Sequence, residues 1–336
     1  MHNIELPTLK RAFSKPVYWL NAGLIYLILT PINMLCLKLG FGPKMLMLTV
    51  KATEGINGGV RAFRKYSPKK HDIFVSTFAK SGTNWMMQVT HQLAFHGKSE
   101  FENIHDVVSW PDMNAGIVKS TPLDSDVVYK ASPESMRVIK THLSAYNVPY
   151  NEDAKYITVI RDPKELFVSS YYFAIGCYGP LMPSLEQWFE LFFAEDFPFN
   201  FGNTWAEHTA SYWEMKEKPN VLVLMFNDMK ADMNGALDSV AEFLEVTLNP
   251  DEQKQVVEKS SFEYMSKIDH KFHHLPQENV PWGHKLKMMR SGKGGNSKEL
   301  LSKEQQDRID RHFMEEFVKL NSDFPYKKLF SKVNKD

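Results

Sequence analysis

A short polar run near residue 80 has the composition of an anion-binding turn that follows a buried strand. The apolar residues of 73–78 predict a strand that is covered on both faces. Lys80-Ser-Gly-Thr-Asn-Trp85 then places a cation, hydroxyls and backbone N–H groups at the start of a helix that we expect to begin near Trp85. Such a terminus attracts anions through its unpaired amides and its dipole. Because the lysine precedes the glycine, the order argues against an ordinary Walker loop that hydrolyses ATP or GTP.

Further predicted strands also end in polar side chains. Met136–Lys140 leads into Thr141-His142, Tyr156–Ile160 leads into Arg161, and Asn220–Phe226 leads into Asn227. From residue 72 onward, short apolar runs alternate with longer helical patterns, one of which starts with Asp162 as cap and Pro163 as first residue. This alternation is typical of an α/β fold with a largely parallel sheet. Ligands of such sheets bind beyond the carboxyl ends of the strands, so these polar residues are expected at one edge.

Together these segments resemble the cytosolic-type sulfotransferases, which use 3′-phosphoadenosine 5′-phosphosulfate (PAPS) as sulfuryl donor. Phe78–Trp85 is similar to their phosphosulfate loop, Lys140–His142 to the segment with their catalytic histidine, Arg161–Tyr172 to their 3′-phosphate segment, and Arg290–Gly295 to their late glycine-rich loop. The resemblance covers about residues 72 to 330 in the right order. It implies a three-layer α/β fold in which helices flank a central, largely parallel sheet with a P-loop-like phosphosulfate loop.

The resemblance also implies a role for each residue. His142 would be the base that takes the proton of the acceptor hydroxyl, Lys80 would contact the bridging oxygen and the leaving phosphate, and Lys140 would hold the sulfonate oxygens. The donor contacts would be Lys80, Ser81, Gly82, Thr83, Asn84, Trp85, Arg161, Ser169, Phe226, Ser260, Phe262, Arg290, Ser291 and Gly292. Because a sulfuryl group carries one negative charge, positioned cations and amides can stabilise its in-line transfer, and no metal ion is expected.

The chain departs from the family pattern at several positions. Phe226 stands where the family often has tyrosine, so it can stack but cannot donate a hydrogen bond. Ser291 replaces a lysine of the 3′-phosphate cradle, and Lys293 is the nearest substitute. The C-terminal dimer motif survives only as Lys298, Ser302, Lys303 and Asp307. Its role in dimerisation is therefore doubtful, and Ser302 with Gln305 instead predicts a capping box at the start of the last helix.

Composition excludes some classes of function. Forty basic and forty acidic residues balance, so nucleic acid is not an expected partner. Cys36 and Cys177 give neither a disulfide framework nor metal-ligand spacing, which fits a reducing, cytoplasmic location. The group His270, His273, His274 and His284 matches no standard zinc pattern, and we assign it to an acceptor pocket or a surface loop.

With the resemblance, the sequence predicts a hydrophobic arm with a basic connector (residues 1–70), a sulfotransferase domain (71–330) and a short tail (331–336). Pro16–Leu37 is an uncharged run of 22 residues, long enough to span a bilayer, although it contains Asn21, Pro31 and Asn33. A second apolar piece, Met45–Val50, favours an arm or an in-plane hairpin over one clean span. Packing on the catalytic domain and contact with a membrane through residues 16–50 both remain open.

The acceptor follows from three aromatic clusters. Tyr171–Tyr178, Trp188–Phe201 and Phe272–Trp282 predict a hydrophobic pocket over His142, and hence a hydrophobic alcohol, phenol or lipid as acceptor. A nucleotide or nucleoside kinase of related P-loop fold is an alternative, but it would need magnesium ligands and a true Walker loop. A non-catalytic nucleotide-binding membrane protein is a second alternative.

Overall fold

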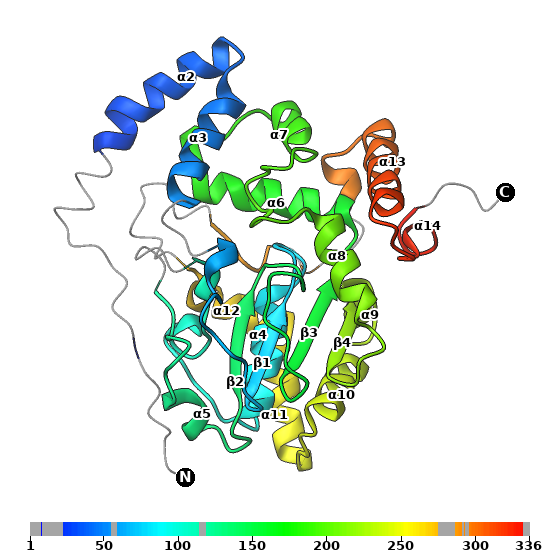
Figure 1. Ribbon diagram of the computed structural model, residues 1–336. Helices are drawn as coiled ribbons and strands as arrows, with labels where there is room; N and C mark the ends of the chain where they lie inside the picture. The colour runs from blue at the N-terminus through cyan, green and yellow to red at the C-terminus, as the bar shows by residue number, and fades with distance from the viewer. Residues whose placement is uncertain are drawn as a thin grey trace.

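A parallel sheet forms the centre of the protein in the computed structural model, which describes residues 8, 23–54, 59–113, 119–274, 286–290, 292 and 296–331. The strands are β1 (Asp72–Ser76), β2 (Arg137–Thr141), β3 (Lys155–Ile160) and β4 (Val221–Met225), in the order β2-β1-β3-β4 (Figure 1). Every neighbouring pair is parallel, and Ser76 pairs with Thr141, so β1 and β2 end level with each other. The predicted α/β fold with a parallel sheet flanked by helices is confirmed.

Helices surround this sheet (Figure 1). They are α2 (Thr30–Lys38), α3 (Gly42–Glu54), α4 (Thr83–Ala94), α5 (Val127–Ala131), α6 (Pro163–Tyr178), α7 (Leu185–Leu191), α8 (Trp205–Glu214), α9 (Phe226–Ala231), α10 (Met233–Leu244), α11 (Pro250–Ser260), α12 (Phe262–Lys267), α13 (Lys303–Lys319) and α14 (Tyr326–Leu329). Short turns of 3-10 helix are η2 (Gly59–Arg61), η3 (Ile104–Asp106), η4 (Pro111–Met113), η5 (Gly179–Leu181), η6 (Asp269–Phe272) and η9 (Asn296–Glu299), and η1 (Leu24–Leu29) is π-helical.

The predicted helix starts are confirmed in their chemistry. The side chain of Asp162 accepts a hydrogen bond from the backbone N–H of Lys164, with Pro163 as first helical residue of α6. Ser302 and Gln305 form the predicted capping box of α13. Helix α4 begins at Thr83, slightly before the expected position.

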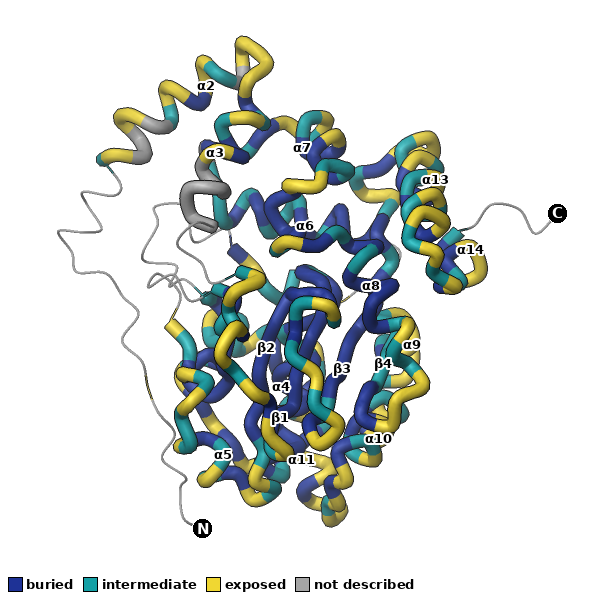
Figure 2. The backbone as a smooth tube through the Cα atoms, viewed as in Figure 1, coloured by how far each residue is buried: buried dark blue, intermediate teal, exposed yellow. Residues whose placement is uncertain are grey.

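The two faces of the sheet are covered differently. On β1, Ile73 and Val75 join an apolar cluster with α4, α10 and α11, whereas Phe74 points to the other face and stacks on Tyr156 at 4.9 Å between ring centroids. Because both faces are covered, every residue of β1 is buried, as its apolar sequence predicts (Figure 2).

A third apolar cluster lies beyond the carboxyl ends of the strands. Helices α6, α7, α8 and α13 build it around Trp188 and Trp205 (Figure 1). Leu46 and Met47 of α3 are buried in the same cluster, so the N-terminal hairpin of α2 and α3 is attached to the domain through α3. This cluster covers the carboxyl ends of the strands.

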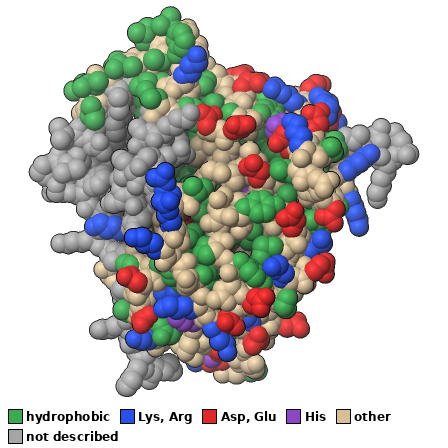
Figure 3. All heavy atoms as spheres, in the orientation of Figure 1, with side chains coloured by type: hydrophobic (Ala, Val, Ile, Leu, Met, Phe, Trp, Pro, Cys, Tyr) green, Lys and Arg blue, Asp and Glu red, His purple; other side chains and the backbone are tan. Residues whose placement is uncertain are grey.

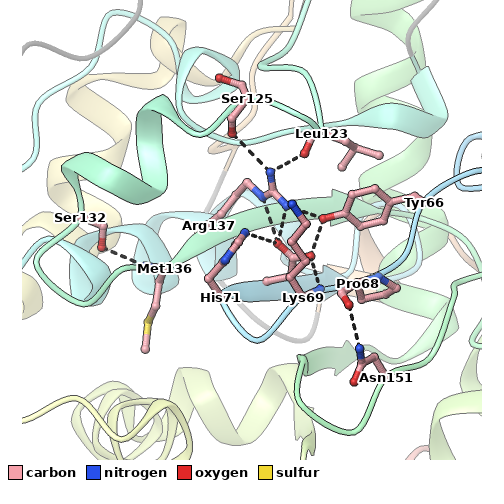
Figure 4. Close-up of polar contacts among 11 residues, drawn as sticks. Tyr66, Pro68, Lys69, His71, Leu123, Ser125, Ser132, Met136, Arg137 and Asn151 are labelled. Carbon is pink, nitrogen blue, oxygen red and sulfur yellow. Dashed lines mark hydrogen bonds and ion pairs between the residues drawn. The ribbon is translucent and has the colours of Figure 1, made fainter.

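The amino ends of β1 and β2 carry a buried ion pair (Figure 4). The guanidinium of Arg137 donates to Asp72 Oδ1 from Nη2 at 2.6 Å and from Nε at 3.0 Å. Tyr66 hydrogen-bonds both Asp72 and Arg137, and the backbone N–H of Lys69 donates to Asp72 at 2.8 Å. The network fixes the connector before β1 to the sheet, on the opposite edge from the predicted site.

The N-terminal region is helical where it is described. Residues 24–37 of the predicted apolar run lie in η1 and α2, and α3 continues to Glu54, beyond the second apolar piece Met45–Val50. Within the described residues, none of the helices is both long and apolar enough to cross a membrane.

Candidate active site

Two residues of the loop between β1 and α4 have left-handed backbone conformations. Lys80 adopts a left-handed φ of 69° and Gly82 a φ of 100°. A Cβ on Gly82 would lie 2.9 Å from the ring of Phe226, so the position requires glycine. Gly82 is the N-cap of α4 and has no side chain that could cap the helix. The first turn therefore has the amides and the dipole needed to bind an anion.

Lys80 is a partly buried cation over an aromatic ring. Its Nζ lies 3.7 Å from the ring centroid of Phe173, and it forms no ion pair with the described carboxylates. Burial lowers the pKa of Lys80 to about 8. A negatively charged ligand at this position would restore the pKa and be held strongly in return.

Lys140 repeats this arrangement at the end of β2. Its Nζ lies 3.1 Å from the ring centroid of Trp110. Burial lowers the pKa of Lys140 to about 7, while the charge of Asp112 opposes the shift. The described residues thus place two cations at the carboxyl edge of the sheet, both poorly neutralised by carboxylates.

The ring of His142 is held in one orientation by a hydrogen bond. Its Nδ1 lies 2.8 Å from the carbonyl oxygen of Thr77 and must donate to it, because a carbonyl can only accept. Nε2 therefore carries the lone pair in the neutral ring. Burial and the charge of Lys140 hold the pKa of His142 well below its usual value, so the ring is neutral at neutral pH. Its backbone N–H donates to Asp112 Oδ2 at 2.9 Å.

Two arginines, Arg161 and Arg290, form a second group of cations in the site. Arg161 donates from Nη1 to the carbonyl oxygen of Lys80 at 2.9 Å, and its guanidinium lies 4.3 Å from the ring centroid of Phe226. Arg290 pairs with Glu299 at 2.9 Å and lies over the ring of Tyr172. These contacts connect the late loop to α6, and Arg161 to the loop between β1 and α4.

Aromatic side chains occupy the space between these cations and α12. The indole N–H of Trp85 donates to the carbonyl oxygen of Ser260 at 2.9 Å, and its ring meets Phe226 edge to face. A Cβ on Gly292 would lie 2.8 Å from the ring of Phe262, so this backbone also packs directly against an aromatic face. Such flat apolar walls suit a heterocyclic base.

One cavity of 560 Å³ collects most of the predicted residues. Its lining includes Lys80, Gly82, Thr83, Asn84, Trp85, Lys140, His142, Arg161, Ser169, Phe226, Phe262, Arg290 and Gly292. Ser81 and Ser260 are buried beside it, and neither Oγ finds a hydrogen-bond partner among the described residues. Ser291 and Lys293 lie outside the described residues.

The wall next to His142 is apolar, as the aromatic clusters predicted. Phe173, Cys177 and Tyr178 come from α6, Pro198, Phe199 and Phe201 from the loop before α8, and Phe272 and His274 from η6 and the residues after it. Phe201 approaches the ring of His142 to 4.8 Å, whereas Trp188 belongs to the core. The three clusters therefore contribute one wall of the same cavity.

The predicted histidine group separates in the structure. His274 lines the cavity, and burial lowers its pKa to about 3. His273 is paired with Asp269 at 2.8 Å, and His284 lies outside the described residues. No three His, Cys, Asp or Glu side chains of the described segments are grouped so that they could hold a metal ion.

Sequence reasoning missed four polar or aromatic residues of the cavity and misplaced one. The cavity is lined by His105, Trp110, Asp112 and Lys230, whereas Asn227 is exposed and does not line it. We expected Asn227 to reach the site because it follows a predicted strand. The strand ends earlier and helix α9 begins at Phe226, so Lys230, one helical turn later, lines the cavity instead. Asp112 lies in the 3-10 turn η4 and Trp110 directly precedes it, and the sequence there carries no pattern that would single them out.

The comparisons with known proteins agree with this geometry. A family model described as the sulfotransferase domain matches residues 70–321. The chain belongs to the sulfotransferase family. Sulfotransferase 2A1 of Mus musculus is 30% identical over 261 residues, which cover 76% of this chain and 87% of that protein. Amine sulfotransferase of Oryctolagus cuniculus is 29% identical over 265 residues, which cover 76% and 82%.

Solved sulfotransferase structures share the fold. Mouse sulfotransferase SULT7A1, complexed with PAP, matches with a TM-score of 0.57 at 20% identity, over 81% of this chain and 91% of that chain. Retinol dehydratase in a complex with retinol and PAP matches with a TM-score of 0.62 at 18% identity, over 81% and 86%. The resemblance inferred from the motifs is therefore confirmed for the family and for the fold, and PAP in both neighbours agrees with the predicted donor.

Proposed function

We propose that this sulfotransferase transfers the sulfuryl group of PAPS to a hydroxyl group of a hydrophobic acceptor, with His142 as base. The observation that carries the proposal is the position of Lys80, Lys140 and His142 on one cavity, between an open helix terminus and an apolar wall. The cations suit an anionic donor and the apolar wall suits an acceptor that carries few charges.

The residues present fit a donor with phosphate at one end and phosphosulfate at the other. Lys80 and the start of α4 would hold the phosphosulfate, and the buried Oγ of Ser81 is an additional donor with no described partner. Arg161, Ser169 and Arg290 would hold the 3′-phosphate. Lys230 lines the cavity and interacts electrostatically with Arg161, so we propose it as the cation that compensates for Ser291.

Three side chains of the protein would take up the acceptor proton and stabilise the charge that develops during sulfuryl transfer. PAPS, when bound, supplies the sulfuryl group and leaves as adenosine 3′,5′-bisphosphate (PAP). As the acceptor oxygen bonds to sulfur, Nε2 of His142 takes the hydroxyl proton. Lys80 stabilises the charge on the departing phosphate, and Lys140 stabilises the sulfonate oxygens. The hydrogen bond from Nδ1 to Thr77 keeps the ring in the tautomer that this step requires.

The acceptor that the lining favours is an alcohol, phenol or lipid. Phe173, Phe199 and Phe201 surround the side of the cavity nearest His142. The same proposal places the enzyme in the cytoplasm, at a membrane surface reached through residues 16–50, where hydrophobic acceptors accumulate. An enzyme that sulfated only water-soluble sugars would contradict this part of the proposal.

Calorimetry with PAP tests the donor site. We expect the wild type to bind PAP, and Arg161→Ala to bind it at least about tenfold more weakly, because a charge-assisted contact to the 3′-phosphate is lost. Adenosine 5′-phosphate, which lacks the 3′-phosphate, should bind the two proteins alike. Absence of PAP binding by the wild type would overturn the proposal.

A donor comparison separates the kinase alternative. We expect transfer from PAPS to a phenol in the presence of a chelator, and no transfer from ATP with magnesium. The reverse result would identify a kinase. Binding of PAP without any turnover on a panel of alcohols, phenols and sterols would favour the non-catalytic alternative.

A further inference from the structure

The hairpin of α2 and α3, together with η1 before it, exposes an unusual amount of apolar surface. Nine of the sixteen large hydrophobic residues that are exposed in the described parts of the chain lie between residues 24 and 48. They are Leu24, Leu27, Ile28, Ile32, Met34, Leu35, Leu39, Phe41 and Leu48. Leu27 is 78% exposed and Leu48 is 66% exposed, whereas Leu46 and Met47 anchor α3 in the core. The apolar surface is thus carried by an element that is itself firmly attached.

The charge of this region is as uneven as its polarity. Residues 6–71 contain eleven Lys and Arg side chains but only one acidic residue, Glu54, in a chain whose total charge is zero. Arg61, Arg64 and Lys65 are exposed and form no ion pair with a described Asp or Glu. Figure 3 shows hydrophobic side chains gathered where α2 lies and Lys and Arg side chains below them on the same face.

This surface adjoins the acceptor side of the cavity. Helix α2 contacts η5, the turn that directly follows Tyr178 of the cavity wall. At the other side, Val60 lines both the cavity and a neighbouring hollow that includes Arg61 and Arg64. The apolar hairpin and the basic residues therefore both border the same cavity.

We propose that residues 24–48 together with the basic residues 61–70 form a docking surface for membranes rich in anionic phospholipid. The apolar side chains enter the boundary between headgroups and acyl chains, and the Lys and Arg side chains contact the headgroup phosphates. The hairpin lies in the plane of the membrane. This inference builds on the proposed membrane location and adds the lipid chemistry that is recognised and a second, basic part of the surface.

The docking surface favours a membrane over a second copy of the chain, because residues 6–53 contain no Asp or Glu. Two such surfaces facing each other would bring like charges together, whereas an anionic bilayer satisfies both the apolar and the basic part. A basic and an apolar side chain already lie next to each other on the hairpin: the ammonium of Lys44 is 5.5 Å from the ring centroid of exposed Phe41.

Vesicle flotation with the full chain tests the proposal. We expect binding to vesicles of phosphatidylcholine with 30% phosphatidylserine, and much weaker binding to phosphatidylcholine alone. Leu27→Ser should weaken binding about tenfold, because one exposed leucine no longer enters the lipid. Val318→Ser is the matched control, since Val318 is 79% exposed on α13 and should change nothing.

The basic part is tested separately. Arg61→Glu with Arg64→Glu should weaken binding to the anionic vesicles by more than about tenfold at low salt, and raised salt should weaken the wild type in the same direction. Lys327→Glu with Lys328→Glu, on exposed positions of α14, is the matched control and should leave binding unchanged.

Three results would overturn the inference: no binding of the wild type to anionic vesicles, equal losses in the variants and their controls, or self-association that Leu27→Ser abolishes without vesicle binding. The last result would make the hairpin an interface between copies. Calorimetry with PAP on the same samples keeps this failure separate from a failure of the proposed reaction, because every variant should retain the wild-type affinity for PAP.

Discussion

Arg137 and Lys140 lie three residues apart on β2, and both are buried, but their surroundings are opposite. Arg137 is paired with Asp72 at 2.6 Å and supported by Tyr66. Lys140 has an aromatic ring under its ammonium and a pKa lowered to about 7, mainly by burial. Burial of a charge is tolerated when a partner comes with it, and otherwise it costs stability. The buried charges at the amino edge of the sheet therefore neutralise each other, whereas the lysines at the carboxyl edge need an anion from outside the protein.

The largest expected effect is on turnover at the carboxyl edge. His142→Ala should lower the rate of sulfuryl transfer by about 10²- to 10⁴-fold, because the acceptor loses its base. Single-turnover kinetics with PAPS and a phenol measures this rate. The PAP affinity and the Tm should stay near the wild-type values, and a parallel loss of both would mean that the ring is structural.

The next effect is on stability at the amino edge. Arg137→Ala should lower the free energy of unfolding by about 3–5 kcal/mol, because Asp72 is left buried without its partner. Urea unfolding measures the change. Asp72→Ala combined with Arg137→Ala should recover part of the loss. A variant that unfolds like the wild type would show that the two edges do not differ as we infer.

Affinity for PAP should depend on pH through the carboxyl edge. The pKa values of Lys80 and Lys140 are lowered to about 8 and about 7, chiefly by burial, and a bound phosphate favours the charged ammonium and raises both. Binding therefore takes up protons, and affinity should fall as pH rises from 7 to 9, at most by about tenfold per pH unit for each proton. Calorimetry in buffers of different ionisation enthalpy counts these protons.

Lys80→Met is the control for that measurement. It should bind PAP weakly and take up fewer protons, while its stability stays equal to that of the wild type or increases, in contrast to Arg137→Ala. Proton uptake that is unchanged in Lys80→Met would place the titrating group elsewhere.

The smallest effect is expected for Asp112→Asn, which keeps the shape of the side chain. Burial raises the pKa of Asp112 to about 6, so its ionisation costs stability as pH rises through about 4 to 6. The variant should therefore have a Tm at pH 7 no lower than the wild type. Loss of the negative charge lowers the pKa of Lys140, so PAP affinity at pH 7.5 should fall by less than about tenfold. Asp72→Asn, by contrast, should lower the Tm clearly.

Much of the fold could be predicted from local sequence patterns. The strands at 73 and 156 are continuous apolar runs, and Asp162 with Pro163 has the chemistry of a helix start, so each could be predicted from neighbouring residues. Lys80, His142 and Arg161 were predicted to meet because parallel strands end at one edge of a sheet. The structure places all three on one cavity.

The remaining features depend on contacts that are distant in sequence. Trp110 and Asp112 approach His142 from a segment thirty residues earlier, and no periodicity marks such a segment. Asn227 was misplaced because one residue decides where a strand becomes a helix, and α9 starts at Phe226. The amino-edge pair was also missed, since Asp72 and Arg137 come together only through the pairing of β1 with β2.

Two of the aromatic residues that shape the cavity are tryptophans, and they stand at its two ends. Trp85 lies at the start of α4, and Trp110 lies beside His142. Indole emission is sensitive to nearby groups, so the protein contains an optical reporter for each half of its site. Because the chain has seven tryptophans, a change in emission that is kept in Trp85→Phe and lost in Trp110→Phe identifies binding near His142. Unlabelled compound collections can then be screened for acceptors by fluorescence, without an assay of turnover.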